Sequence, residues 1–130
     1  MSETIFTKIV TREIPADIIY EDATLLAFLD ISPVAKGHTL LIVKQPYEWM
    51  QDVPDTDIAH AFITAKKLIL AMKKSLACDY VQIAVTGKDV PHFHIHLIPK
   101  MLPDSPDFTK GPGYIEGEAA VYALKIKSAL

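Results

Sequence analysis

One stretch of the sequence decides the fold: Pro91-His92-Phe93-His94-Ile95-His96-Leu97-Ile98-Pro99. Imidazole and apolar side chains alternate along it, and a period of two is typical of a β-strand with one buried face. The three histidines are therefore predicted to share one face, while Phe93, Ile95 and Leu97 pack into the core behind them. The plainer alternative is a half-exposed strand with polar filler, although threonine, lysine or glutamate would serve equally well there.

A face of three histidines allows a metal site, because imidazole is a common ligand for zinc, copper, iron and nickel. Along an extended strand, however, the Cα atoms of His92 and His96 lie ~13 Å apart. Imidazole nitrogens must approach a metal to ~2.0–2.1 Å, so all three converge only if the strand bends sharply. A neighbouring pair together with His38 remains possible. We expect no metal and no other cofactor.

The second chemistry open to this face is nucleophilic attack on phosphorus. A neutral imidazole can attack a phosphoryl group and form a covalent intermediate, which divides one difficult displacement into two easier ones. Donors must surround the phosphate oxygens, where negative charge accumulates, and flanking imidazoles can supply them. His94 is the better candidate nucleophile, because His92 and His96 on either side could reach the same phosphate.

The rest of the chain predicts an α+β fold with a mainly antiparallel sheet of about five strands, one long helix and one or two short helices. The connections are too short for several parallel βαβ crossovers. Apolar patterns and turn residues predict strands over residues 18–20, 25–29, 38–43, 80–86 and 93–98, a first helix over 5–13 ended by Pro15, a long helix from about Asp55, and a terminal helix over 118–130.

Composition narrows the class of protein. The 130 residues, 50% of them hydrophobic, predict a single domain over 1–130, with a core from about 4 to 100 and a variable tail over 101–130 that includes a Pro/Gly-rich excursion over 101–117. The net charge of −3 offers no broad basic face for duplex nucleic acid or an anionic membrane. With Cys78 as the lone cysteine, and no visible signal peptide or membrane span, we expect a soluble cytoplasmic protein.

Residues 92–98 resemble the signature of the histidine-triad (HIT) superfamily of nucleotide hydrolases and transferases, His-φ-His-φ-His-φ-φ, in which φ is apolar. The likeness continues in residues 4–22, 26–33 and 37–44, so it covers about residues 4–100. It is closest to the purine nucleoside phosphoramidases and related hydrolases.

The resemblance implies a HIT-like fold and the cleavage of a nucleoside 5′-monophosphoryl group from a phosphoramidate or a dinucleoside polyphosphate. His94 would carry the nucleotide as a covalent adduct that water then hydrolyses, while His38, His92 and His96 would orient and contact the phosphate. The substrate would be an AMP-like purine nucleotide. A homodimer joined across the long helix and a neighbouring strand is also implied.

The resemblance further assigns residues to the nucleoside. Asp30 would accept hydrogen bonds from the ribose hydroxyls, although a carboxylate in a Pro-containing loop can also be a simple turn residue. The purine slot would be formed by Ile5, Phe6, Ile9, Phe28, Leu29, Ile31 and Leu40. Ordinary core packing is the alternative for these apolar side chains.

Four positions depart from the family pattern. Thr4 and Thr7 stand where many relatives carry zinc-binding cysteines, so a structural zinc is not expected. Lys88 replaces a phosphate-contacting glutamine and can still act as a point charge. Asp89 replaces a residue, usually serine, that assists the leaving group, and a carboxylate there repels phosphate unless it is protonated. A catalytically weak, purine-nucleotide-binding regulatory protein is therefore the first alternative function. A metalloprotein with histidine ligands is the second, less favoured alternative.

Overall fold

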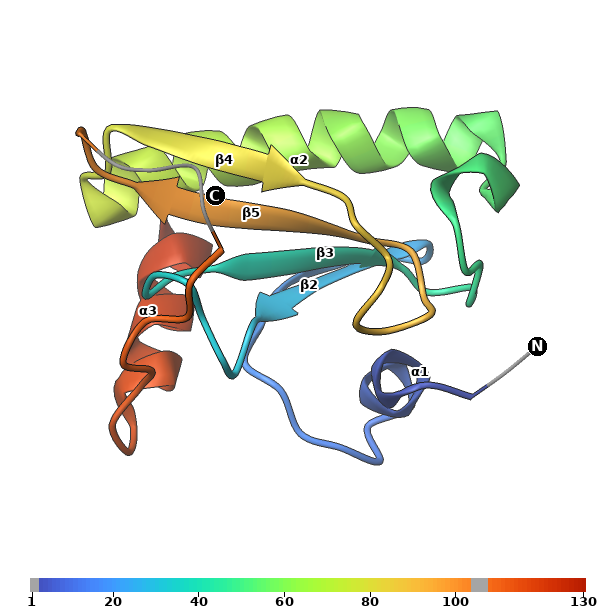
Figure 1. The fold of residues 1–130 in the computed structure, drawn as a ribbon, viewed down its shortest axis with the longest axis horizontal. Helices are drawn as coiled ribbons and strands as arrows, with labels where there is room; N and C mark the ends of the chain where they lie inside the picture. The colour runs from blue at the N-terminus through green and yellow to red at the C-terminus, as the bar shows by residue number, and fades with distance from the viewer. Residues whose placement is uncertain (1–2, 104–107) are drawn as a thin grey trace.

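The computed structural model describes residues 3–103 and 108–130, and over these residues five strands form one antiparallel sheet (Figure 1). The strands are β1 (Ile18–Glu21), β2 (Leu25–Leu29), β3 (Thr39–Val43), β4 (Tyr80–Ala84) and β5 (His94–Lys100). Their order across the sheet is β1-β2-β3-β5-β4, and every neighbouring pair is antiparallel. The predicted α+β class and its mainly antiparallel sheet are confirmed.

Three α-helices and one short 3-10 turn accompany the sheet within the described residues: α1 (Ile5–Val10), η1 (Met50–Asp52), α2 (Asp55–Leu76) and α3 (Glu118–Ser128). The long helix α2 packs against β3, β4 and β5, and α3 packs against β1 and β2 (Figure 1). None of the helices in the described part of the chain is long and apolar enough to cross a membrane.

The two faces of the sheet have separate cores, because side chains alternate along each strand. One face packs beneath α2 and α3 and includes Phe93, Ile95 and Leu97, as the sequence predicts. The opposite face packs against α1 through a smaller buried cluster that consists of Phe6, Ile9, Leu26, Phe28, Leu40 and Ile42. His94 pairs with Ile42 and His96 with Leu40 across β3 and β5, so both histidines lie on the α1 face.

Some element bounds differ from the predictions. The first helix ends at Val10 and not beside Pro15, because Arg12 adopts the left-handed conformation with φ 68° and turns the chain away. The histidine strand begins at His94, one residue later than predicted, so His92 lies just outside it. Helix α2 begins at Asp55, as predicted, and ends where Ala77 takes φ 53°.

The C-terminal tail contacts the loop between β2 and β3. Gly111 N–H donates a hydrogen bond to the Pro33 carbonyl (2.9 Å), and Gly37 N–H donates to the Tyr114 hydroxyl (2.8 Å). Lys36 and Glu118 form an ion pair of 2.9 Å at the start of α3. The tail therefore holds the loop that leads into His38. Residues 104–107 of the predicted excursion lie outside the described residues.

Candidate active site

His94 has the hydrogen-bond pattern of an imidazole nucleophile. Its Nδ1–H donates to the His92 carbonyl at 2.6 Å, so the lone pair of the neutral ring lies on Nε2. Within the described part of the chain, this Nε2 is buried and has no hydrogen-bond partner. The ring of Phe6 packs edge-on against the imidazole, with 5.0 Å between ring centroids. The side chain is thus held in one orientation with a free nitrogen.

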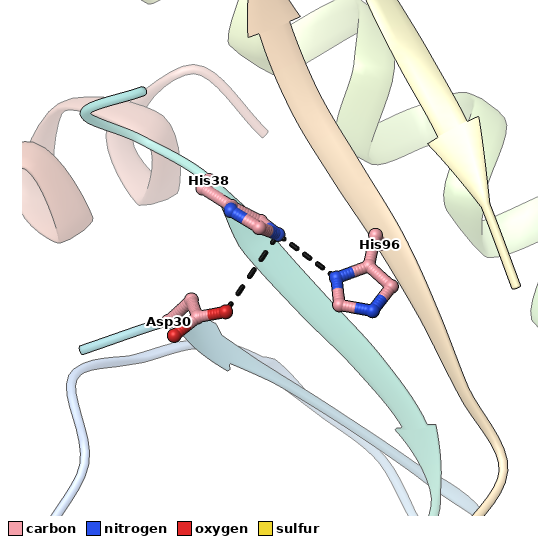
Figure 2. A group of neighbouring side chains, drawn as sticks. All are labelled: Asp30, His38 and His96. Carbon is pink, nitrogen blue, oxygen red and sulfur yellow. Dashed lines mark hydrogen bonds and ion pairs between the residues drawn. The ribbon is translucent and has the colours of Figure 1, made fainter. Parts of the chain in front are cut away.

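His96 is oriented by a chain of hydrogen bonds that begins at a backbone amide and reaches His96 through His38. Figure 2 shows the bond between His38 and His96. Val34 N–H donates to His38 Nδ1 at 3.1 Å, so the proton of the neutral His38 ring must lie on Nε2. That Nε2–H donates to His96 Nδ1 at 3.0 Å. The proton of His96 consequently lies on its own Nε2. His96 therefore offers an N–H donor beside His94, with 4.8 Å between the two ring centroids.

Burial keeps the rings of His38 and His96 neutral. Burial first, and then the neighbouring His96, lowers the pKa of His38 to about 3. Burial and the nearby His94 also lower the pKa of His96. Protonation of His38 would place a second donor against Val34 N–H, so the low pKa preserves the donor direction that fixes His96.

His92 uses both ring nitrogens within the protein. Its Nε2–H donates to the Val43 carbonyl at 2.6 Å, and its Nδ1 accepts from the Thr4 hydroxyl at 3.3 Å. Burial lowers the pKa of His92, although its bond to Val43 works in the opposite direction. The geometry gives His92 a positioning role, because its own carbonyl is the group that holds His94 Nδ1.

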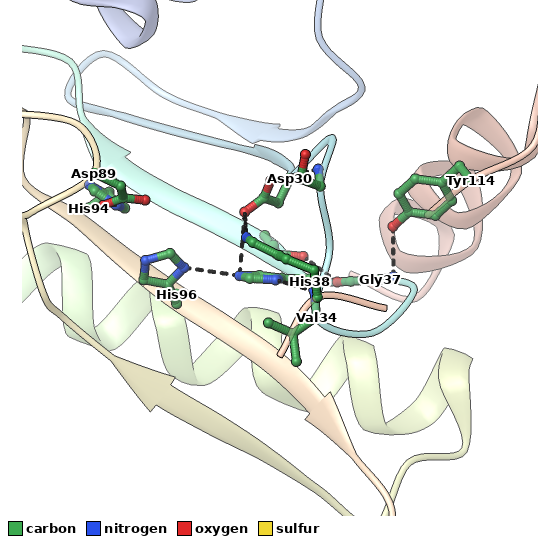
Figure 3. A network of polar contacts seen from close by, with 11 residues as sticks. Asp30, Val34, Gly37, His38, Asp89, His94, His96 and Tyr114 are labelled. Carbon is green, nitrogen blue, oxygen red and sulfur yellow. Dashed lines mark hydrogen bonds and ion pairs between the residues drawn. The ribbon is translucent and has the colours of Figure 1, made fainter. Parts of the chain in front are cut away.

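Asp30 lies at the His38 end of the histidine group (Figure 3). Lys110 lies beside Asp30. One carboxylate oxygen of Asp30 accepts from Ser32 N–H at 2.9 Å. The other lies 3.8 Å from His38 Nε2 and 3.9 Å from the ammonium of Lys110. A cation from the C-terminal tail thus stands next to the carboxylate that follows β2.

Asp89 approaches the free nitrogen of His94 from the loop between β4 and β5 (Figure 3). Its Oδ1 lies 3.4 Å from His94 Nε2, although 58% of the Asp89 side chain is exposed. Burial works to raise the pKa of this carboxyl, but His94 and His96 outweigh it and hold the pKa below its ordinary value. The unpartnered Nε2 of His94 and a carboxylate therefore face each other.

A nitrogen lone pair and a fixed N–H donor on one face are the parts that phosphoryl transfer requires. In the comparison with known proteins, the model of the HIT domain family matches residues 11–101. The chain belongs to the HIT family.

The HIT protein is similar over most of its length to proteins of an archaeon, a yeast and a bacterium. It is 43% identical over 101 residues to a HIT-like protein of Methanocaldococcus jannaschii, an alignment that covers 74% of this chain and 78% of the relative. It is 41% identical over 100 residues to the adenosine 5′-monophosphoramidase of Saccharomyces cerevisiae, covering 74% and 61%. The solved structure of a HIT-like protein from Bartonella henselae superposes with a TM-score of 0.88 at 29% identity, covering 98% and 96%.

The HIT fold brings most of the residues expected from the sequence to the α1 face. The four histidines, Asp30 and Asp89 form one connected polar group, and the buried side chains beside them on this face are Phe6, Ile9, Phe28 and Leu40. Ile5 and Lys88 are exposed, and Ile31 is 79% exposed. Leu29 lies in the cluster beneath α2 and α3, so the sheet separates it from the histidines.

Three contributors were missed from the sequence. The Val34 amide fixes the His38 ring, the Thr4 hydroxyl bonds to His92, and Lys110 reaches Asp30. Thr4 carried a signal that could have been used, because Thr4 and Thr7 form a capping box at the start of α1. Val34 and Lys110 carried none, since both act through contacts distant in sequence or through the backbone.

Two groups of described residues bring three metal-ligand atoms within 4.8 Å of one another: Asp30, His38 and His96, and Asp89, His94 and His96. A histidine ligates a metal through an unprotonated nitrogen. In the first group, the facing nitrogens of His38 and His96 already share one proton at 3.0 Å. In the second, the same chain places a proton on His96 Nε2. The donor set therefore fits a phosphate oxygen better than a cation.

Proposed function

We propose that this HIT protein cleaves nucleoside 5′-monophosphoryl groups by hydrolysis or transfer, with His94 as the nucleophile that carries the nucleotide. One observation supports the proposal above all. His94 Nε2 is buried without a hydrogen-bond partner in the described structure, while a backbone carbonyl holds Nδ1–H. An unpaired buried polar atom is costly, so its retention fits a reactive role.

His96 would donate its Nε2–H to a phosphate oxygen as negative charge accumulates in the transition state. The chain from Val34 through His38 supports this role, because it leaves His96 no other tautomer. The resemblance also implies phosphate contacts from His38 and His92. The two bonds of His92 instead favour a positioning role for that residue.

The nucleoside would bind along the α1 face, with Asp30 accepting from the ribose hydroxyls. The apolar cluster around Phe6 and Phe28 would form the floor of a purine slot, and the exposed Ile5 and Ile31 would flank it. An AMP-like nucleotide is supported by the likeness to an adenosine 5′-monophosphoramidase. Phosphoramidates and dinucleoside polyphosphates are the proposed substrate types.

A catalytically weak nucleotide-binding protein is the second candidate function, and the position of Asp89 favours it. A carboxylate 3.4 Å from the attacking nitrogen repels an incoming phosphate if it stays charged. This candidate predicts nucleotide binding with negligible turnover.

Turnover of adenosine 5′-phosphoramidate and of diadenosine polyphosphates separates the two candidates. We expect the wild-type protein to release AMP, and His94→Asn to lose at least about 10³-fold in kcat because no covalent intermediate can form. His60→Asn is the matched control, since His60 is an exposed histidine of α2 that bonds to Asp22. It should keep wild-type turnover. Equal AMP release by wild type and His94→Asn would overturn the nucleophile assignment.

We further propose a homodimer that pairs two copies through β4 and α2. β4 is an edge strand, and unpaired edge strands are templates for pairing with another chain. Exposed apolar side chains on and next to these elements support the proposal, namely Ile63, Leu70, Ile83 and Val85. Light scattering should show a dimer that Ile83→Glu converts to a monomer, whereas Leu124→Glu on the exposed face of α3 leaves it intact. A monomeric wild-type protein would contradict the proposal. The cytoplasmic location stays a prediction.

A further inference from the structure

Asp89 is the one acidic side chain that the described structure places against the nucleophilic nitrogen. Its Oδ1 stands 3.4 Å from His94 Nε2, while most of the side chain remains in solvent. A phosphoryl group that reaches Nε2 must therefore displace this carboxyl or bind beside it.

The pair of Asp89 and His94 is suited to hold one proton. Two facing lone pairs at 3.4 Å repel each other, and a proton on either atom removes the repulsion. The other titratable groups that act here are His96 and His38, whose burial lowers their pKa values, and Lys110 beside Asp30. None of them offers a lone pair that competes for the proton, because the bonds from Val34 and His38 occupy Nδ1 of His38 and His96.

Substrate binding would place the proton of this pair on Asp89. In the free protein the neighbouring His94 and His96 hold the pKa of the Asp89 carboxyl below its ordinary value. A bound phosphate brings negative charge next to Asp89, and a like charge favours the neutral form of a carboxyl. With the proton on Asp89, the Nε2 lone pair of His94 is available for attack and Asp89 can act as an acid.

Resting on the proposed function, we propose that Asp89 is the acid–base catalyst of both half-reactions. In the first, the Nε2 lone pair of His94 bonds to phosphorus. The bond from phosphorus to the leaving nitrogen or oxygen breaks with its electron pair, and the leaving atom takes the proton of the Asp89 carboxylic acid.

In the second half-reaction, a water oxygen bonds to phosphorus and gives its proton to the Asp89 carboxylate. The bond between phosphorus and Nε2 breaks, and its electron pair returns to His94. AMP leaves, and the pair again holds one proton. An acid of this kind matters most for a strongly basic leaving group such as an amine. The inference therefore selects phosphoramidates over substrates whose leaving groups are stable anions.

The test compares Asp89→Asn with wild type on two substrates that differ in leaving group. With adenosine 5′-phosphoramidate, we expect kcat to fall about 10²- to 10⁴-fold, the usual contribution of acid–base catalysis. With the p-nitrophenyl ester of AMP, the first step needs no acid. Asp89→Asn should then give a burst of p-nitrophenol followed by slow turnover, with the His94 adduct accumulating in intact-mass spectra.

Rescue by added formate distinguishes an acid–base role of Asp89 from a purely structural role. In Asp89→Gly, added formate should restore turnover of the phosphoramidate, because a small carboxylate can occupy the vacated space. Glu116→Gln removes an exposed carboxylate just before α3 and is the matched control, with wild-type rates and no response to formate.

The outcomes separate this inference from the proposed function. If Asp89→Asn matches or exceeds wild type on both substrates while wild type still forms the His94 adduct, the acid–base role is overturned and the nucleophile stands. If wild type forms no adduct and releases no AMP, both are overturned. If Asp89→Asn turns over the ester slowly but accumulates no His94 adduct, Asp89 does not act in the second half-reaction. That result would overturn its proposed role in both half-reactions.

Discussion

His94 and His96 are two residues apart on one face of β5, yet their surroundings differ in kind. The Nδ1 of His96 receives a proton from His38, whose own ring is fixed by the Val34 amide. The Nδ1–H of His94 is also fixed, by the His92 carbonyl, but its Nε2 has no hydrogen-bond partner among the described residues and lies 3.4 Å from the carboxylate of the exposed Asp89.

The difference divides the site into two parts. The closed side is the hydrogen-bond chain of Val34, His38 and His96, and the open side is His94 with the exposed Asp89. The closed side is buried and ends at a backbone amide, so the protonation states of His38 and His96 depend little on solvent near neutral pH. The side of His94, the proposed nucleophile, opens to the loop between β4 and β5, where the exposed Asp89 meets solvent. Functional variation is concentrated on loops carried by a rigid scaffold, and this arrangement agrees with that pattern.

Replacing His38 should have the largest effect on the closed side, because it removes the hydrogen-bond chain from Val34 to His96. In His38→Phe, His96 Nδ1 loses its donor and its proton can shift from Nε2, so the phosphate donor is no longer fixed. Loss of one such donor typically costs about 10²- to 10³-fold in kcat, and we expect a fall of about 10²-fold. Nitrogen chemical shifts of the His96 ring should report the change of tautomer, and AMP release should report kcat.

Two variants sharpen this result. His60→Phe replaces an exposed histidine and should change neither kcat nor the His96 spectrum. Asp89→Asn should leave the His96 tautomer intact even where it lowers turnover, because Asp89 belongs to the open side. A His96 ring that keeps its Nε2 proton in His38→Phe would show that the Val34 chain does not control it.

The pH dependence of stability is the next test of the closed side. The pKa of His38 is 6.5 when unperturbed and about 3 in the folded protein. Below pH 6.5 His38 becomes protonated in the unfolded chain, whereas in the folded protein it stays neutral until about pH 3. The free energy of unfolding therefore falls as pH falls. The contribution is fully present above about pH 6.5. One proton gives a slope of at most about 1.4 kcal/mol per pH unit.

Urea unfolding between about pH 7 and pH 5 measures this slope above the range where most carboxyls titrate. The lowered pKa values of His92 and His96 act in the same direction and steepen it. We expect His38→Phe to flatten the dependence and His60→Phe to leave it unchanged. Parallel slopes for wild type and His38→Phe would contradict a neutral, buried His38.

The sequence predicted those features that depend on local patterns. Period-two alternation located β5, short runs of apolar residues located β2 and β3, and apolar residues three and four apart located α2. Alternation also gave the shared face of His94 and His96. The same rule could have excluded Leu29 from the purine slot, because neighbours on a strand such as Phe28 and Leu29 point to opposite faces.

Other features of the site could not be read from local patterns. The orientation of His38 depends on an amide in an irregular loop, and that loop is held by Gly111 and Tyr114 of the tail. The contact between Lys110 and Asp30 likewise joins residues 80 positions apart. Such contacts follow from how the tail returns to the sheet, and no periodic pattern encodes that return.

The smallest expected effect concerns Thr4, which joins α1 to the histidine face. Its hydroxyl accepts from Thr7 N–H as the N-cap of α1 and bonds to His92 Nδ1. Thr4→Val should lower the free energy of unfolding by about 1 kcal/mol, the usual cost of losing an N-cap. Urea unfolding measures the loss, and Thr11→Val, which removes an exposed hydroxyl bonded to Lys8 and Glu13, is the matched control.

Turnover of Thr4→Val tells how His92 acts. If His92 serves through its backbone carbonyl, the ring can lose the Thr4 bond while His94 Nδ1–H keeps its acceptor, and kcat should stay close to wild type. A large fall in kcat with little loss of stability would instead mean that the ring of His92 takes part directly, as the family resemblance implies. His92 would then join His94 on the open side of the site, because its ring nitrogen would have to be released from Thr4 before it could reach a phosphate.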